Sequence, residues 1–175
     1  HRLTFSGIWE LPVGRRRAWG RHMAAPLEAL LGNWQFSAVI VRQAGPPLLW
    51  GNIIFQGDPD RIALPKGERT VDRWFNVDAG FNRIANQALS QNIRFFPRYL
   101  ASVQRDGQAR WDVSVVKTFR IAERLSFRMR IQCFNIMNHP NFAGPNTTPT
   151  NAQFGTVTRT QSIGRSFQMA GTVSF

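Results

Sequence analysis

Apolar and polar residues alternate over the last stretch of the chain, residues 164–175. Successive side chains of a β-strand point to opposite faces, so this alternation predicts a strand with one apolar and one polar face. The polar face carries Ser, Gln and Thr side chains with one alanine. The apolar face comprises Phe167, Met169, Gly171, Val173 and Phe175.

The same alternation recurs in four earlier segments of the chain. Each is near the roughly 9–11 residues that a tilted strand needs to cross an outer membrane. We therefore predict an all-β fold: the last strands of a large antiparallel transmembrane outer-membrane β-barrel, which is incomplete in this chain. The predicted strands cover approximately residues 3–12, 34–43, 110–121, 124–136 and 164–175.

The polar strand faces carry charges that a dry core would not hold. In the segment 125–133, Arg128 and Arg130 alternate with Phe, Met and Ile residues, and a buried unpaired guanidinium is very costly. In a barrel this face looks into a wet lumen, and the apolar face contacts lipid. The residues that we expect to face the lumen are Arg120, Arg128, Arg130 and Asp112. As partners of these arginines we expect carboxylates such as Glu10 and Asp112.

The apolar strand faces carry three further signals. Lys117 interrupts the apolar face of its strand, and we expect its ammonium to reach water by snorkelling at an interface. Cys133 falls on the same type of face, which favours an inert buried thiol. Trp34 and Trp111 stand at strand ends, where barrels carry girdles of interface aromatics.

The lengths of the connections predict a topology, because outer-membrane barrels have short periplasmic turns and long external loops. The tight link at residues 122–124 is then a periplasmic turn. The long segments 44–109 and 137–163, rich in Pro, Gly and Asn, become external loops. The connection 13–33 becomes periplasmic, with a short helix expected at 24–31.

The charge of the chain introduces a competing function. The formal net charge is +12, with 22 basic residues, nearly all of them arginine. A basic nucleic-acid-binding β-domain is therefore the alternative to a membrane barrel. Such a domain would place Arg and aromatic side chains on one strand face, whereas Phe127 and Arg128 have opposite parity. This parity makes nucleic acid an unlikely partner.

No constellation of residues predicts catalysis, and we expect neither an enzyme nor a cofactor. The three histidines are scattered, and the single cysteine excludes an intrachain disulfide and a Cys-based zinc cluster. Asp58 and Asp60 form a DxD pair in a Gly/Pro-rich loop, which allows weak calcium binding but is more typical of a solvated turn. His139 precedes a proline in an Asn-rich loop, which favours a turn role.

Several short motifs, taken in order, are more specific than the periodicity. They are ELPVG at 10–14, LGNWQ at 31–35, QAGPPL at 43–48, RWFN at 73–76, DVSVVK at 112–117, FNIMNHPNF at 134–142, FGTVT at 154–158 and RSFQ at 165–168. In this order they resemble the C-terminal barrel region of Oar-like TonB-dependent transporters, the group that carries an N-terminal carboxypeptidase-regulatory-like domain. The match departs from the family pattern at Gln132-Cys133 and at residues 106–110.

The resemblance implies energy-coupled uptake across the outer membrane of a Gram-negative bacterium by a barrel of about 22 strands with a plugged lumen. The last strand, with its C-terminal Phe175, resembles the closing strand that carries the barrel-assembly signal. The implied partners are outer-membrane lipid, the barrel-assembly machinery, upstream strands and a plug of the same full-length chain, and the TonB complex. The plug is also a second source of carboxylates for the lumen arginines.

Two matters stay open at this point. A surface adhesin or assembly protein would use the same barrel without import, and the transported substrate is not encoded in any motif of these strands. We expect the chain to be a fragment of a longer protein, since it contains no plug domain and no TonB box, and a truncated gene product is the alternative.

Overall fold

The computed structural model describes residues 1–15, 17–87 and 93–175 and divides the chain into two compact units. The strand unit comprises His1–Gln43, Ala109–His139 and Ile163–Phe175. The loop unit comprises Ala44–Gln108 and Pro140–Ser162.

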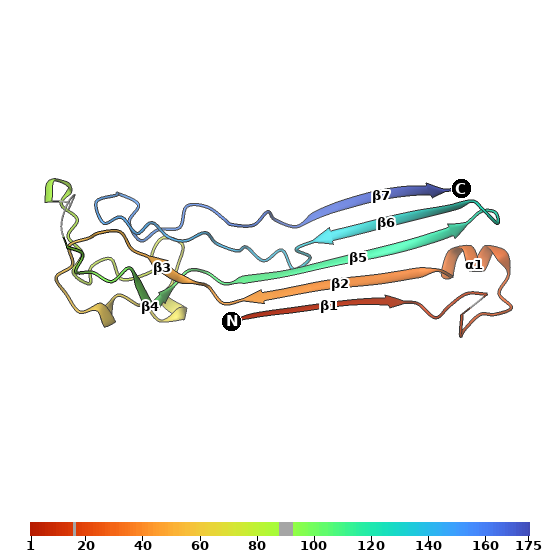
Figure 1. The fold of residues 1–175 in the computed structure, drawn as a ribbon, viewed down its shortest axis with the longest axis horizontal. Coiled ribbons are helices and arrows are strands. Elements are labelled where there is room, and N and C mark those ends of the chain that lie inside the picture. Colours follow the sequence, from red (N-terminus) through yellow and green to blue (C-terminus); the bar gives the residue numbers. More distant parts are fainter. Residues whose placement is uncertain (16, 88–92) are drawn as a thin grey trace. The chain divides into compact units, whose positions relative to one another are not determined.

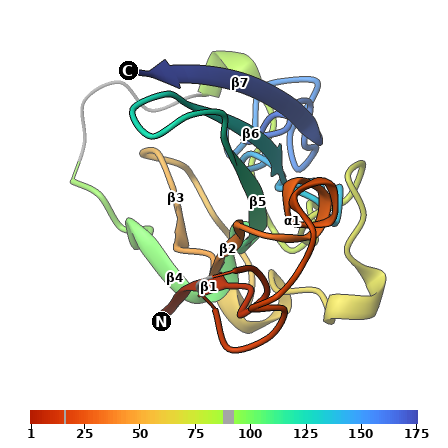
Figure 2. The ribbon, with the colours of Figure 1, turned by 90° about the vertical axis from the view of Figure 1, so that its right-hand side faces the viewer.

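The strand unit is a five-stranded sheet in the order β1-β2-β5-β6-β7 (Figure 1). Neighbouring strands run in opposite directions, and β1 and β7 form the two edges (Figures 1 and 2). The predicted antiparallel all-β fold is confirmed. The strands are β1 (Arg2–Glu10), β2 (Trp34–Gln43), β5 (Gln108–Arg120), β6 (Ser126–Phe134) and β7 (Ser166–Ser174).

The observed bounds of the strands differ by a few residues from those predicted from the alternation, and each difference has a local reason. β1 ends before Pro12, which has no N–H to donate. β6 begins only at Ser126, because Leu125 belongs to the preceding turn and donates its N–H to the Ala122 carbonyl at 3.3 Å. Strand β6 ends before Asn135, because the φ of this residue is 51° and a left-handed residue cannot continue a strand.

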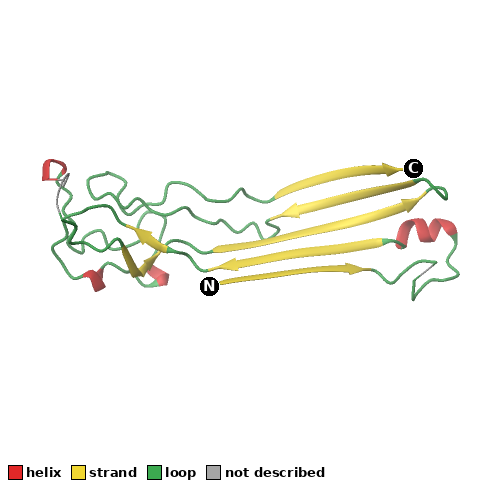
Figure 3. Cartoon of the chain, viewed as in Figure 1, coloured by secondary structure: helices red, strands yellow, loops and turns green. Residues whose placement is uncertain are grey.

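One end of the strand unit gathers three features and is called the turn end below. The tight turn at residues 122–124 joins β5 to β6 there. Phe175 is there too, since Ser174 pairs with Ser126 at the start of β6. The third feature is α1 (Ala25–Leu31), which lies within the helix predicted at 24–31 and is followed directly by β2 (Figure 3).

No helix among the described residues combines the length and apolar character needed to cross a membrane.

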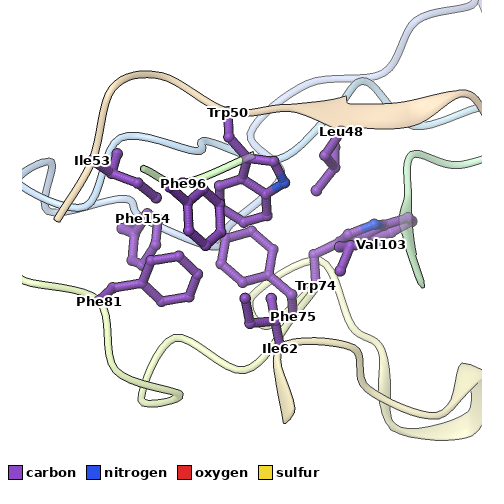
Figure 4. Packing of buried hydrophobic residues seen from close by; sticks show 10 residues of the cluster. All are labelled: Leu48, Trp50, Ile53, Ile62, Trp74, Phe75, Phe81, Phe96, Val103 and Phe154. Atoms are coloured by element: carbon purple, nitrogen blue, oxygen red, sulfur yellow. The ribbon is translucent and has the colours of Figure 1, made fainter. Parts of the chain in front are cut away.

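The loop unit is more ordered than two surface loops. Its described residues form a two-stranded sheet, β3 (Pro47–Leu49) with β4 (Tyr99–Gln104), and three short 3-10 helices, η1 (Pro59–Arg61), η2 (Lys66–Glu68) and η3 (Ala85–Gln87). Its buried core is largely aromatic (Figure 4). The core residues are Leu48, Trp50, Ile53, Ile62, Trp74, Phe75, Phe81, Phe96, Val103 and Phe154.

Rings in this core meet mostly edge to face. The Phe75 ring centroid lies 5.0 Å from that of Trp50 and 5.2 Å from that of Phe154, both T-shaped. The Trp74 indole donates to the Gln104 carbonyl at 2.8 Å. Burial of a large apolar side chain stabilises by roughly 1.5–3 kcal/mol, so the sequence segments 44–108 and 140–162 fold around a core of their own.

Candidate functional site

The two faces of the strand sheet are the candidate functional surfaces. Between β5, β6 and β7 the register pairs apolar residues with apolar residues: Val115 faces Ile131, and Ile131 faces Met169. Between β1 and β2, Phe5 faces Ile40 and Gly7 faces Ala38. At these positions each strand turns an apolar residue to the same side as its partner, whereas Leu3 faces Arg42 and Met129 faces Lys117.

The apolar face of β1 and β2 lies on the same side of the sheet as the apolar face of β5, β6 and β7. The Lys117 ammonium of β5 lies 5.2 Å from the ring centroids of both Trp34, at the start of β2, and Phe119. Trp34 shares its parity with the apolar residues of β2, so both groups form one apolar face. Its members are Leu3, Phe5, Trp9, Trp34, Phe36, Ala38, Ile40, Val113, Val115, Phe119, Phe127, Met129, Ile131, Cys133, Phe167, Met169 and Val173.

Much of the apolar face is exposed in the chain by itself. At the edges, Leu3, Phe5 and Trp9 of β1 and Phe167 and Met169 of β7 are all exposed large hydrophobic residues. Extended exposed apolar surfaces of this kind are typical of membrane or protein contacts.

Of the C-terminal residues that resemble an assembly signal, Phe167, Met169, Gly171 and Val173 lie on this apolar face, and Phe175 follows the last residue of β7. Gly171 also has a packing role, because a Cβ atom at this position would lie 3.1 Å from the ring of Phe127. The aromatic ring of β6 thus covers the glycine of β7, an arrangement that pins strand register.

The opposite face carries the four residues expected to face the lumen. Asp112 and Arg120 lie on β5 with the parity of Ser114, and Arg128 and Arg130 lie on β6. Thr118 and Thr172 flank Arg128, whereas Val116 and Ala170 flank Arg130. Both arginines are exposed.

The expected pairing of these arginines with Glu10 and Asp112 is wrong. Asp112 accepts from the Arg110 guanidinium at 2.8 Å, and Glu10 accepts from Arg17 at 2.6 Å. The physical reason is proximity: Arg110 precedes Asp112 by two residues and so shares its strand face, and Arg17 belongs to the connection that directly follows β1.

The FNIMNHPNF motif builds the turn that leaves β6. Asn135 is buried and left-handed, its side chain donates to the His139 carbonyl at 3.1 Å, and it accepts from the His139 N–H at 3.1 Å. The Asn135 N–H donates to Asp112 Oδ1 at 3.0 Å. Asn138 accepts from the Arg165 N–H at 3.1 Å, which ties the turn to the segment before β7. His139 thus has the turn role that its sequence context favours.

Asn135→Ala is expected to destabilise the folded full-length protein by about 2–4 kcal/mol, since it loses two side-chain hydrogen bonds and places alanine at a left-handed φ. The midpoint of urea-induced unfolding in detergent measures this effect. Asn135→Gly keeps the backbone preference and should cost less. Equal stability of both variants with the wild type would contradict a structural role for the motif.

Aromatic residues gather at the turn end of the apolar face. Besides the predicted Trp34, they include Trp9, whose ring centroid lies 6.0 Å from that of Phe36, and Phe119, which stacks on Phe127 at 6.1 Å. Trp111 lies near the other end of β5, where its carbonyl accepts from the Ile136 N–H. Trp34 and Trp111 therefore stand at opposite ends of the sheet.

Lys117 is buried rather than snorkelling, with a relative exposure of 1%. Its ammonium donates to the Gly32 carbonyl, at the carboxyl end of α1, and lies over the Trp34 and Phe119 rings. A charge on an apolar face needs such partners, because burial without them is very costly. The sequence signal for this contact was the single charge on an otherwise apolar strand face.

The loop unit holds a small pocket of about 120 Å³. Its wall is largely apolar and also carries amide and hydroxyl side chains, among them Asn82, Gln87, Thr148 and Thr150. Asn82 is already engaged, since it donates to Gln87 Oε1 at 2.8 Å.

The DxD pair of the loop unit forms a turn. Asp58 Oδ1 accepts from the Asp60 N–H at 3.0 Å and caps η1. Across the described ranges, no group of three or more His, Cys, Asp or Glu side chains is placed to hold a metal ion.

Comparison with known proteins agrees with the geometry of the sheet. The family model described as an outer membrane beta barrel domain matches residues 1–168. No curated protein and no solved structure matches the chain. The apolar and polar faces described above are those that a strand sheet of an outer-membrane barrel requires. The chain therefore belongs to the outer membrane beta barrel domain family, and its place is the outer membrane.

Proposed function

We propose that this chain is part of the barrel wall of an Oar-like TonB-dependent transporter, which takes up a large or scarce substrate. The observation that carries the proposal is the strand register, which sets one continuous apolar face against a face bearing Arg120, Arg128 and Arg130. The motif order from ELPVG to RSFQ supports the transporter group in particular.

In this proposal the apolar face contacts lipid and the arginine face lines the lumen. Arg128 and Arg130 are exposed and retain hydrogen-bonding capacity for carboxylates of a plug or for an anionic part of the substrate. Asp112 contributes differently, since Arg110 and Asn135 already bind it and it stabilises the strand end.

The turn end is the periplasmic end in this proposal. The tight turn at 122–124 belongs there, as expected for a barrel with short periplasmic turns. In the sequence, segments 44–108 and 140–162 follow the ends of β2 and β6 that are away from the turn end, so the proposal assigns them as external loops, where recognition residues belong.

A five-stranded sheet with open edges at β1 and β7 cannot close a barrel. Unpaired backbone groups at an edge in lipid cost several kcal/mol each. We therefore expect residues 1–175, expressed alone, to aggregate in detergent, which size-exclusion chromatography with circular dichroism measures. A monodisperse, sheet-rich species would contradict the need for further strands.

Sequencing the DNA upstream of the His1 codon is the simplest test of the transporter assignment. We expect the reading frame upstream of the His1 codon to encode a signal peptide, a plug with a TonB box and about 17 further amphipathic strands. The purified C-terminal domain of TonB should then capture the full-length protein and fail to capture a variant without the TonB box. A barrel without a plug would favour the adhesin or assembly alternative and contradict import.

The nucleic-acid alternative finds no support in the strand faces. Phe127 and Met129 lie opposite Arg128 and Arg130 across the sheet, so the aromatic ring and the arginines of β6 are on different faces. A transport or structural role, without catalysis, fits the barrel family better.

A further inference from the structure

Helix α1 has an apolar side that the described residues leave about half exposed or more. None of its residues is buried, and Leu27, Leu30 and Leu31 are 46%, 66% and 45% exposed. At 100° per residue these three leucines fall within one stripe of the helix. Such a stripe on a helix at the surface needs a partner, and its place in the fold identifies which one.

The carboxyl end of α1 is held on the apolar face of the sheet. Lys117 donates its ammonium to the Gly32 carbonyl, and the Trp34 indole donates to the Leu30 carbonyl at 2.9 Å. Both donors project from the apolar face, so the helix end lies on that side and not on the arginine side. In Figure 2, α1 lies beside the sheet near β2 and β5.

The other side of α1 turns toward the strands. Ala25, Glu28 and Ala29 line a cleft of about 630 Å³, with residues 118–123 at the end of β5 among the other lining residues. Glu28 is fixed there by the Arg15 guanidinium at 2.9 Å. With this side oriented toward the cleft, the leucine stripe points away from it.

We propose that α1 is an interfacial helix whose leucine stripe enters the periplasmic leaflet of the outer membrane. The leucines extend the apolar face beyond the end of the strands, at the level of the aromatic residues Trp9, Trp34 and Phe119, where interfacial side chains belong. The partner is phospholipid. This inference rests on the proposed lipid contact of the apolar face.

The arrangement also explains the position of Lys117. On a lipid-facing strand face its ammonium would lie close to acyl chains, and the Gly32 carbonyl with the Trp34 and Phe119 rings replaces its water. The contact that shields the lysine thus also fixes the helix at the membrane surface.

The test places nitroxide labels on single cysteines of the full-length protein in a Cys133→Ala background. The protein is reconstituted in vesicles of phosphatidylethanolamine and phosphatidylglycerol. Power saturation compares collisions with oxygen, which concentrates in lipid, and with a neutral nickel chelate, which stays in water. Labels replace Leu30 and Leu31 on the stripe, Ala29 on the cleft side as the matched control, and Met129 as the reference for the apolar face.

We expect labels at 30 and 31 to favour oxygen, as at 129, and the label at 29 to favour nickel several-fold more. Nickel-dominated collisions at 30 and 31, with an oxygen-dominated label at 129, would overturn the interfacial helix and leave the proposed faces intact. A nickel-dominated label at 129 would instead overturn the assignment of the apolar face to lipid, and the helix proposal with it. Two stripe positions guard against a local effect of either label.

Discussion

Ile131→Arg is expected to destabilise the full-length barrel by about 2–4 kcal/mol, the largest cost that a single surface substitution should show. Ile131 lies near the middle of β6 with Val115 and Met169 as cross-strand partners, so a guanidinium there meets apolar neighbours and, in the proposed orientation, hydrocarbon. The midpoint of urea-induced unfolding in lipid vesicles measures the loss. Reduced heat-modifiable protein in isolated outer membranes should accompany it.

Gln132→Arg is the matched control, one residue away on the same strand. Gln132 faces Ser114 and Gln168 on the arginine side of the sheet, where a further cation meets polar neighbours. We expect a change within about 0.5 kcal/mol. Equal costs at positions 131 and 132 would mean that the two faces of β6 see the same environment, which contradicts a barrel wall.

Phe75→Ala is expected to destabilise the loop unit by about 3–5 kcal/mol, the range for removing a buried phenylalanine. Phe75 is fully buried, and its ring contacts Trp50, Phe81 and Phe154. Hydrogen exchange on the full-length protein measures the effect peptide by peptide. Amides of β3 and β4 should lose protection, while those of β6 and β7 keep it.

Phe95→Ala removes the same ring from a position that is 88% exposed. We expect protection in the loop unit to stay within the error of the wild type, because an exposed ring contributes little burial. If Phe75→Ala also leaves β3 and β4 protected, the aromatic cluster does not stabilise the loop unit.

The strand sheet was largely predictable because its signal is periodic. Alternation over β6 and β7 pairs Phe127 with Val173 and Ile131 with Met169, and any shift by one residue would reverse the faces. Local exceptions set the strand bounds, such as Pro12 and the left-handed Asn135.

The loop unit could not be predicted in the same way. Trp50, Phe75, Phe96 and Phe154 come from distant segments with neither a period of two nor one of 3.6, so their joint burial has no local signature. The prediction of the ion-pair partners of the arginines was wrong for a related reason. Sequence parity showed which face Arg128 and Asp112 share, but it did not show that Arg110 was close enough to bind Asp112 first.

The central claim is that the apolar face meets lipid and the arginine face meets water, and a label scan along β6 tests it most directly. Nitroxides at each position from 126 to 133 of the full-length protein, in phospholipid vesicles, report collisions with oxygen and with the nickel chelate. We predict a period of two, with oxygen dominant at 127, 129, 131 and 133 and nickel dominant at 126, 128, 130 and 132. A profile without alternation, or one with the opposite phase, would contradict the account.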